Sequence, residues 1–166
     1  MYKILFLFLI CFSLANNVFF SPNGECRQRL IELIQNTTQD INIAIYSFTS
    51  KEIALALLGE KNKGRKIKIV SDRHQSQNKY SQLDFLANHL PVRILPLPQK
   101  KRGSMHHKFM VIGGFVATGS YNWSQNAEYY NNENLIVMND ANAAQAYLGE
   151  FKKIWKYAKP WENKLK

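Results

Sequence analysis

The stretch "SMHHKFMVIGG", Ser104–Gly114, places two adjacent histidines and a lysine before an apolar run that ends in two glycines. Because side chains alternate between the two faces of a strand, His106 and Lys108 would share one face and His107 and Phe109 the other. The large apolar ring of Phe109 predicts that its face packs on the core, with His107 on the packed side or at its rim. His106 and Lys108 are then the polar pair that can do chemistry.

The two glycines predict a tight turn after this strand, since glycine accepts the positive φ that a two-residue hairpin turn requires. The next run, "FVATGS" (115–120), would therefore return antiparallel to the first strand. This pairing carries the Ser120 hydroxyl and the Asn122 amide to the end of the sheet where His106 lies. Glu133, further along the chain, would add a carboxylate.

Outward from the hairpin, strand patterns alternate with helical patterns. Apolar residues recur with a period of two in the first kind and every three or four residues in the second. Strands are predicted at 17–23, 40–48, 65–72, 91–98, 105–112, 115–120 and 133–139, and helices at 26–37, 50–64, 80–88 and 142–158, with a polar loop at 73–79. The alternation predicts one α/β domain, a sandwich in which helices flank a mixed β-sheet.

The composition is strongly basic. The chain of 166 residues carries 22 Lys and Arg against 12 Asp and Glu, a formal net charge of +10. This balance predicts a polyanionic partner, and both nucleic acid and anionic lipid headgroups qualify.

The first residues, "MYKILFLFLICFSLA", have one lysine, an apolar run from Ile4 to Ala15 and a small-residue end. This pattern is typical of a secretory signal peptide, and the run is shorter than the ~20 residues that a spanning helix needs. We expect residues 1–15 to be a cleaved signal peptide and residues 16–166 to form the mature domain, secreted or periplasmic. The alternative is an uncleaved leader that anchors the protein to a membrane.

The hairpin resembles the phospholipase D superfamily, whose signature reads H-x-K-x4-D followed by G-S-x-N. The matching residues are His106-x-Lys108, then "GSYN" at 119–122, with Glu133 where the small single-motif bacterial nucleases of that superfamily keep a glutamate. The opening segments "FFSPN" and "INIAIYSFTS" also look like those nucleases, so the resemblance spans most of the mature chain. It implies a phospholipase D/nuclease-like sandwich.

The resemblance also implies a catalytic role for each matched residue. His106, when neutral, would attack phosphorus and form a covalent phosphohistidine. Lys108, Asn122 and Ser120 would hold the non-bridging oxygens and stabilise charge in the transition state. Glu133 would accept from the other ring nitrogen of His106 and so orient the imidazole. This scheme needs no metal and no other cofactor.

The chain holds one copy of the motif, whereas the leaving oxygen needs a second group that protonates it. Superfamily members with one motif resemble half of an enzyme and pair as homodimers about a two-fold axis. We therefore expect an obligate homodimer with the His106 side chains of both subunits at one shared site, one as nucleophile and one as general acid.

The chain departs from the superfamily signature at the turn. Counted from His106, the aspartate of the motif should stand at Gly113, and the connection to Ser120 is one residue short. Both facts fit the loss of a single aspartate before the glycines. A shortened hairpin can shift strand register and misalign Ser120 and Asn122. Restoring an aspartate between Ile112 and Gly113 is expected to raise activity if its loss impairs the site.

Substrate contacts are predicted on both sides of the motif. Lys100, Lys101 and Arg102 precede it by a few residues and offer an electrostatic approach for phosphates. Aromatic side chains flank Asn122 and can stack on exposed bases, and Trp123 is our candidate among them. The aromatic group is Tyr121, Trp123, Tyr129 and Tyr130.

No metal site is predicted, because the histidines lack a zinc-ligand spacing and His74 and His89 have the surroundings of surface residues. The first functional hypothesis is a metal-independent endonuclease that cleaves DNA or RNA with little sequence preference and leans toward single strands. The second is a phospholipase D, and the third is a nucleic-acid-binding relic without catalysis. Size and charge favour the first.

Overall fold

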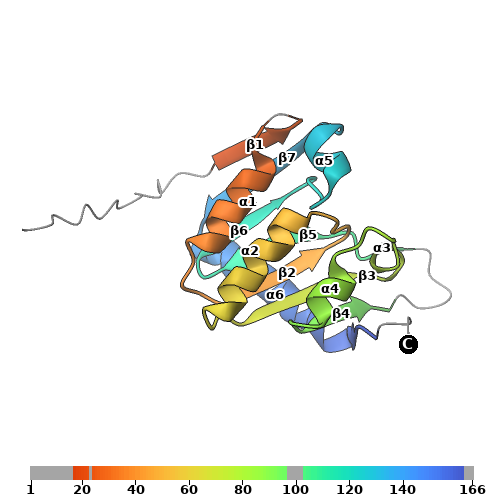
Figure 1. Cartoon of the computed structure of the whole chain (residues 1–166). Coiled ribbons are helices and arrows are strands. Elements are labelled where there is room, and N and C mark those ends of the chain that lie inside the picture. The colour runs from red at the N-terminus through yellow and green to blue at the C-terminus, as the bar shows by residue number, and fades with distance from the viewer. Residues whose placement is uncertain (1–16, 23, 97–102, 163–166) are drawn as a thin grey trace, which may run out of the picture.

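The protein is described from a computed structural model, which covers residues 17–22, 24–96 and 103–162. Within these residues eight strands form one sheet in the order β1-β7-β6-β5-β2-β3-β4-β8 (Figure 1). The strands are β1 (Asn17–Ser21), β2 (Ile41–Ile45), β3 (Ile67–Asp72), β4 (Val92–Leu95), β5 (Lys108–Ile112), β6 (Phe115–Gly119), β7 (Glu133–Asn139) and β8 (Lys159–Pro160). The helices are α1 (Cys26–Gln35), α2 (Lys51–Asn62), α3 (Arg73–Ser76), α4 (Leu83–Ala87), α5 (Gln125–Tyr129) and α6 (Ala141–Tyr157).

The sheet is mixed and the domain is single, as predicted. β3 pairs in parallel with both β2 and β4, whereas the hairpin strands β5 and β6 and their neighbours pair antiparallel. Helices cover both faces, with α1 and α2 in front of the sheet and α6 behind it in Figure 1. The prediction of an α/β sandwich in which helices flank a mixed sheet is confirmed.

Two short helices occupy stretches without a predicted helix. α3 lies inside the predicted polar loop, where the Asp72 carboxylate caps it by accepting from the backbone N–H groups of His74 and Gln75. α5 follows the "GSYN" segment, and the Ser124 hydroxyl caps it by accepting from Ala127 N. Helices of four and five residues are too short to show a 3.6-residue periodicity, so their capping residues are the only sequence signal.

Strand β5 is buried on both faces, which corrects one expectation. Phe109 and Val111 pack in the core under α6, as predicted, but Met110 is fully buried in the core under α1 and α2. The face that carries Lys108 is therefore a second core face, because helices cover both sides of this sheet. Only the start of β5 remains accessible for chemistry.

The glycine turn forms as predicted. Ile112 lies opposite Phe115, which leaves Gly113 and Gly114 as a two-residue turn with Gly113 at a φ of 56°. The register continues to Phe109 opposite Thr118. The pairing of β5 with β6 is thus regular although the connection is one residue shorter than in the superfamily signature. The segment after β6 lies beside the start of β5.

In the part of the chain that the structure describes, no helix combines the length and apolar character needed to cross a membrane. The predicted leader, residues 1–15, and the basic residues Lys100, Lys101 and Arg102 lie outside the described residues.

Candidate active site

His106 and Lys108 form a contacting pair at the start of β5. The Lys108 ammonium donates to His106 Nδ1 at 3.1 Å and to the His106 carbonyl oxygen at 3.0 Å. Lys108 is 8% exposed, whereas His106 is exposed. The pair therefore joins an accessible imidazole to a cation that the fold holds in place.

Tyr46, which directly follows β2, lies against both members of the pair. Its ring centroid is 4.3 Å from that of His106, and Lys108 Nζ lies 4.9 Å from it over the ring. The register explains this contact, because Ile45 is opposite Lys108 in the β2–β5 ladder. An aromatic face beside a buried ammonium favours the cation electrostatically. Tyr46 is a site residue that the sequence analysis missed.

The electrostatic surroundings favour a neutral imidazole. The pKa of His106 lies below its ordinary value because the surrounding protein partly desolvates the ring and because the Lys108 charge disfavours a second cation. The nearby charge of Asp72 opposes this shift without reversing it. Burial also lowers the pKa of Lys108, and the negative charge of Glu133 partly offsets that effect. A neutral histidine is the form that can act as a nucleophile.

The turn after β6 depends on Gly119. Its φ is 150°, and a Cβ atom there would lie 2.2 Å from the carbonyl oxygen of Asn134. With glycine in place, Ser120 N donates to Asn134 Oδ1 and Asn134 N donates to Ser120 Oγ, both at 3.1 Å. Ser120 is exposed at the end of β6, and these bonds fix its hydroxyl at the same sheet edge as His106.

Asn122 is tied to the segment after β2. Its side-chain Oδ1 accepts from Ser47 N at 3.3 Å, and Trp123 N donates back to the Ser47 carbonyl oxygen at 3.2 Å. Since β2 and β6 flank β5 on its two sides, these bonds connect the segments on either side of the start of β5. The structure thus brings Asn122 to the edge that carries His106 and Lys108.

Glu133 begins β7, and its Oε1 accepts from Asn131 Nδ2 at 3.0 Å. Its charge acts on Lys108, while the carboxylate whose charge acts on His106 is Asp72. Glu133 therefore lies within electrostatic reach of the site. Its role as the group that orients the imidazole stays a prediction.

Asp72 is a second residue that the sequence analysis missed. It ends β3, is fully buried, and its Oδ2 accepts from Met105 N at 3.1 Å while its Oδ1 caps α3. The carboxylate thus fixes the backbone one residue before His106. Asp72 ends a predicted strand and Tyr46 lies near the end of another, which is a signal because α/β folds place their sites at this sheet edge.

Trp123 corrects the prediction of substrate stacking. Its side chain is 2% exposed and packs edge-on against Phe48 in the core, so its ring is not available to a base. Tyr121 is also buried, and its hydroxyl donates to Glu128 Oε2. The sequence around Trp123 does not indicate whether its ring points into the core or toward solvent.

The neighbouring histidine lies on the other side of the sheet, as predicted. The ring of His107 contacts Phe109 edge-on at 5.3 Å, and its Nε2 lies 3.7 Å from Glu150 Oε1 on α6. Its side chain is 46% exposed, which is the rim position expected from strand alternation.

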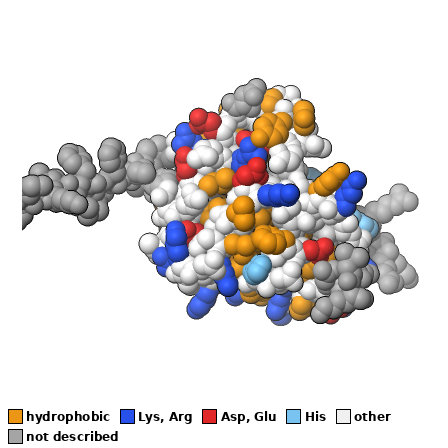
Figure 2. All heavy atoms as spheres, in the orientation of Figure 1, with side chains coloured by type: hydrophobic (Ala, Val, Ile, Leu, Met, Phe, Trp, Pro, Cys, Tyr) orange, Lys and Arg blue, Asp and Glu red, His pale blue; other side chains and the backbone are white. Residues whose placement is uncertain are grey.

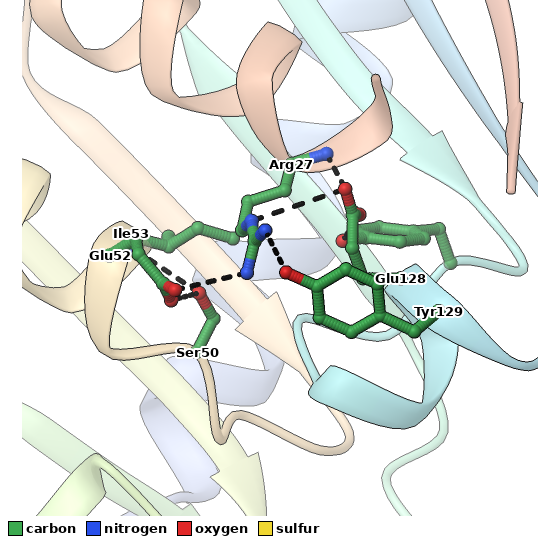
Figure 3. Close-up of polar contacts among 7 residues, drawn as sticks. Arg27, Ser50, Glu52, Ile53, Glu128 and Tyr129 are labelled. Atoms are coloured by element: carbon green, nitrogen blue, oxygen red, sulfur yellow. Dashed lines mark hydrogen bonds and ion pairs between the residues drawn. The ribbon is translucent and has the colours of Figure 1, made fainter. Parts of the chain in front are cut away.

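A polar network braces the helix that follows Asn122 (Figure 3). Arg27 at the start of α1 donates to Glu52 Oε1 of α2 at 3.0 Å and to the Tyr129 hydroxyl of α5 at 2.6 Å. The Arg27 backbone N–H also donates to Glu128 Oε2 at 3.2 Å. These contacts join three helices that are far apart in sequence and hold α5, and with it the segment 119–124, against the sheet.

Among the described residues, no group of three or more histidine, cysteine, aspartate or glutamate side chains is placed to hold a metal ion. The chemistry that the site offers is that of a neutral imidazole, an ammonium group, an amide and a hydroxyl at one sheet edge. This set can attack a phosphodiester and stabilise its negative oxygens.

Comparison with known proteins agrees with this chemistry. A family model described as "Cardiolipin synthase, PLD-like domain" matches residues 30–155. A relative named "Mitochondrial cardiolipin hydrolase" from Chlamydomonas reinhardtii is 31% identical over 138 residues, which cover 82% of this chain and 60% of the relative. The chain thus spans about 60% of the length of that curated relative.

Two solved structures match over nearly their whole length. The phospholipase D family member Nuc from Salmonella typhimurium superposes with a TM-score of 0.82 at 27% identity, covering 90% of this chain and 99% of Nuc. NucT from Helicobacter pylori also gives 0.82, at 30% identity and with 89% and 99% covered. The fold predicted from the hairpin is therefore found in both.

Proposed function

Since the chain belongs to the phospholipase D-like family, we propose that it is a metal-independent phosphodiesterase, a non-specific endonuclease that hydrolyses DNA or RNA through a covalent phosphohistidine. The observation that carries the proposal is the contact between the exposed His106 imidazole, whose pKa is lowered, and the buried Lys108 ammonium. A nucleophile and an anion-binding cation are thereby fixed side by side.

In the first step, a ring nitrogen of His106 attacks phosphorus, a P–N bond forms and the P–O bond to the leaving group breaks. The Lys108 ammonium, which donates to His106 Nδ1, can instead donate to a non-bridging phosphate oxygen. This exchange frees the ring nitrogen at the moment when the phosphate arrives. Asn122 and Ser120, at the same edge, would bind the remaining oxygens.

The leaving oxygen must gain a proton, and a second histidine, in its protonated form, can supply it. We propose that this group is His106 of a second copy, in a homodimer with both histidines at one site. In the second step that histidine, now neutral, accepts a proton from water, the water oxygen attacks phosphorus, and the P–N bond breaks. Light scattering tests the dimer, and an active monomer would contradict it.

The choice of nucleic acid over lipid rests on charge and size. A net charge of +10 on a small domain suits a long polyanion. Phospholipid is the second candidate, because the relative from Chlamydomonas reinhardtii is named a cardiolipin hydrolase. The segment Lys100, Lys101 and Arg102 is proposed to guide phosphates toward His106.

One experiment separates these functions. Purified protein is incubated in excess EDTA with single-stranded DNA, duplex DNA, RNA and phospholipid vesicles, beside a His106→Ala variant. Cleavage of nucleic acid by the unmodified protein alone is expected. Nuclease activity that EDTA abolishes would contradict the mechanism, cleavage of lipid alone would favour the phospholipase, and binding without turnover would favour the relic.

Export is proposed for the same protein through cleavage after Ala15. Sequencing the N-terminus of the protein recovered from the periplasm or the medium is expected to give Asn16 as the first residue. Recovery in the membrane fraction with Met1 intact would favour the anchored alternative.

A further inference from the structure

A polar groove of about 830 Å³ lies beside the candidate active site. Its walls come from three segments: the stretch from the end of β2 to the start of α2, the α3–α4 connection, and the start of α5. The side chains that matter for its chemistry are Ser47, Lys51, Gln75, Lys79, Tyr80 and Gln125.

The groove adjoins the site through two contacts. Gln75 in its wall donates through Nε2 to the Tyr46 hydroxyl at 3.4 Å, and the Tyr46 ring lies 4.3 Å from that of His106. Ser47 in the opposite wall donates its backbone N–H to Asn122 Oδ1. A chain bound at His106 can therefore continue into the groove.

The lining has the chemistry of a single-strand binding surface. Lys51 and Lys79 are exposed and carry positive charge, and amide side chains supply further donors and acceptors. Tyr80 is 64% exposed, and Lys79 Nζ lies 4.8 Å from its ring centroid on one face. An exposed aromatic ring next to cations is the arrangement on which unpaired bases stack while phosphates meet the charges.

We propose that this groove binds the unpaired nucleotides on one side of the scissile phosphate, with Tyr80 stacking on a base and Lys51 and Lys79 contacting neighbouring phosphates. The inference rests on the proposed nuclease function and deepens it, because it names the single strand as the substrate class. A base inside a duplex cannot present its face to Tyr80, so the groove discriminates against paired DNA.

The lining does not suit lipid acyl chains. Acyl chains need apolar surface, whereas the groove is lined by lysine, hydroxyl and amide side chains with Tyr80 as its one large ring. Exposed apolar side chains gather near the centre of the face that Figure 2 shows. Leu55 of α2, which is 60% exposed, is not part of the groove lining. The groove thus favours a polar, charged polymer.

The test measures binding separately from turnover. In the His106→Ala background, a labelled oligothymidylate of about twelve nucleotides reports groove occupancy whether or not the protein is a nuclease. Changing Lys51 and Lys79 together to Ala is expected to weaken binding about ten-fold or more and to lower the salt slope by about 1.4, at ~0.7 for each lost phosphate contact. Tyr80→Ala is expected to weaken binding about ten-fold, and Tyr80→Phe to restore it, since phenylalanine keeps the stacking face.

A matched control removes the same charge elsewhere. Lys61 lies at the far end of α2 from Lys51, and Lys156 lies on α6, so their double change to Ala alters net charge equally without touching the groove. Its effect on binding is expected to be less than about three-fold. Equal effects of the two double variants would overturn the proposal, because binding would then follow net charge alone.

Turnover in the His106-intact protein distinguishes the two proposals. Hydrolysis of bis(p-nitrophenyl) phosphate, which is too small to reach the groove, is expected to be unchanged by the groove variants, while KM for single-stranded DNA rises. An oligothymidylate that binds through Tyr80 but is not cleaved would uphold the groove and defeat the nuclease. Cleavage of DNA with no loss in any groove variant would uphold the nuclease proposal and contradict the groove proposal. Equal affinity for a duplex of the same length would also contradict the groove proposal.

Discussion

The two ends of strand β5 differ in what holds them. At its start, His106 and Lys108 contact Tyr46, which follows β2. Asp72 at the end of β3 accepts from Met105 N, and Asn122 after β6 accepts from Ser47 N. At its other end a turn of two glycines joins β5 to β6, and a backbone bond from Asp140 N to the Gly114 carbonyl oxygen, at 3.1 Å, ties the turn to the end of β7. The first end gathers side chains from segments far apart in the chain, whereas the second is a backbone turn.

Within this motif, the residues that can react therefore lie at one end of β5, and the turn that connects two strands lies at the other. The histidine and lysine lie at the start of β5, whereas the position of the absent aspartate lies at the turn. With ~3.3 Å per residue, Gly113 is about 16 Å along the strand from Lys108. Changes at the start of β5 should therefore act on catalysis, and changes at the turn should act on stability.

The largest effect is expected at His106. His106→Ala removes the nucleophile and should lower kcat for a phosphodiester on the order of 10⁴-fold or more. The adjacent His107 supplies a matched control, because its side chain packs against Phe109 and Glu150 on the α6 side. His107→Ala is expected to lower kcat less than about three-fold, since its contact with Glu150 is largely solvent-exposed. Similar losses in both variants, with unchanged circular dichroism, would mean that strand alternation does not define the reactive face.

The second-largest effect on kcat is expected at Lys108. Lys108→Met keeps the length of the side chain but removes the cation beside His106, which is expected to lower kcat about 10²- to 10³-fold through lost stabilisation of the phosphate oxygens. Lys68→Met, on strand β3, which β2 separates from β5, removes the same charge from the face on which Lys68 lies over Trp155 and should leave kcat unchanged. Steady-state kinetics on a small phosphodiester measures both, and a full-rate Lys108→Met enzyme would exclude an anion-binding role for the ammonium.

The pH dependence of kcat/KM tests the electrostatics at the start of β5. The proposed homodimer needs one neutral and one protonated imidazole at its shared site, so it predicts a bell-shaped pH dependence of kcat/KM. Desolvation and the Lys108 charge lower the pKa of His106 from its ordinary value of 6.5, so the maximum is expected on the acid side of that value. Lys108→Met removes a neighbouring positive charge, makes protonation easier and should move the maximum to higher pH. A maximum above pH 6.5 in the unmodified protein would contradict the lowered pKa.

Sequence reasoning predicted what depends on local pattern. The predicted strands and long helices, the glycine turn and the opposite orientation of His106 and His107 follow from periodicity and backbone preference, and they are found. The strand predicted at 105–112 begins only at Lys108, and the two-residue strand β8 was not predicted. The burial of Met110 on the second face of β5 was not predicted, because alternation along β5 shows that Met110 points away from Phe109 but not that α1 and α2 lie above it.

The remaining site features depend on tertiary arrangement. Tyr46 and Asp72 reach the site only because β2 and β3 end at the same edge as β5 begins. The burial of Trp123 follows from its pairing beside Phe48, a contact across 75 residues of sequence that no local pattern encodes.

The smallest effect on activity is expected at the glycine turn. Inserting an aspartate between Ile112 and Gly113 lengthens a turn that already preserves the pairing of Phe109 with Thr118, so kcat should change less than about two-fold at ~16 Å from the site. Gly113→Ala is the complementary change, because a φ of 56° and a Cβ only 3.0 Å from Gln39 Cγ should cost about 1 kcal/mol of unfolding free energy without altering kcat. Thermal denaturation and kinetics on the same samples separate the two quantities. An insertion that raises kcat about ten-fold or more would show that the shortened hairpin reaches the site through strand register, and the two ends of β5 would then be coupled.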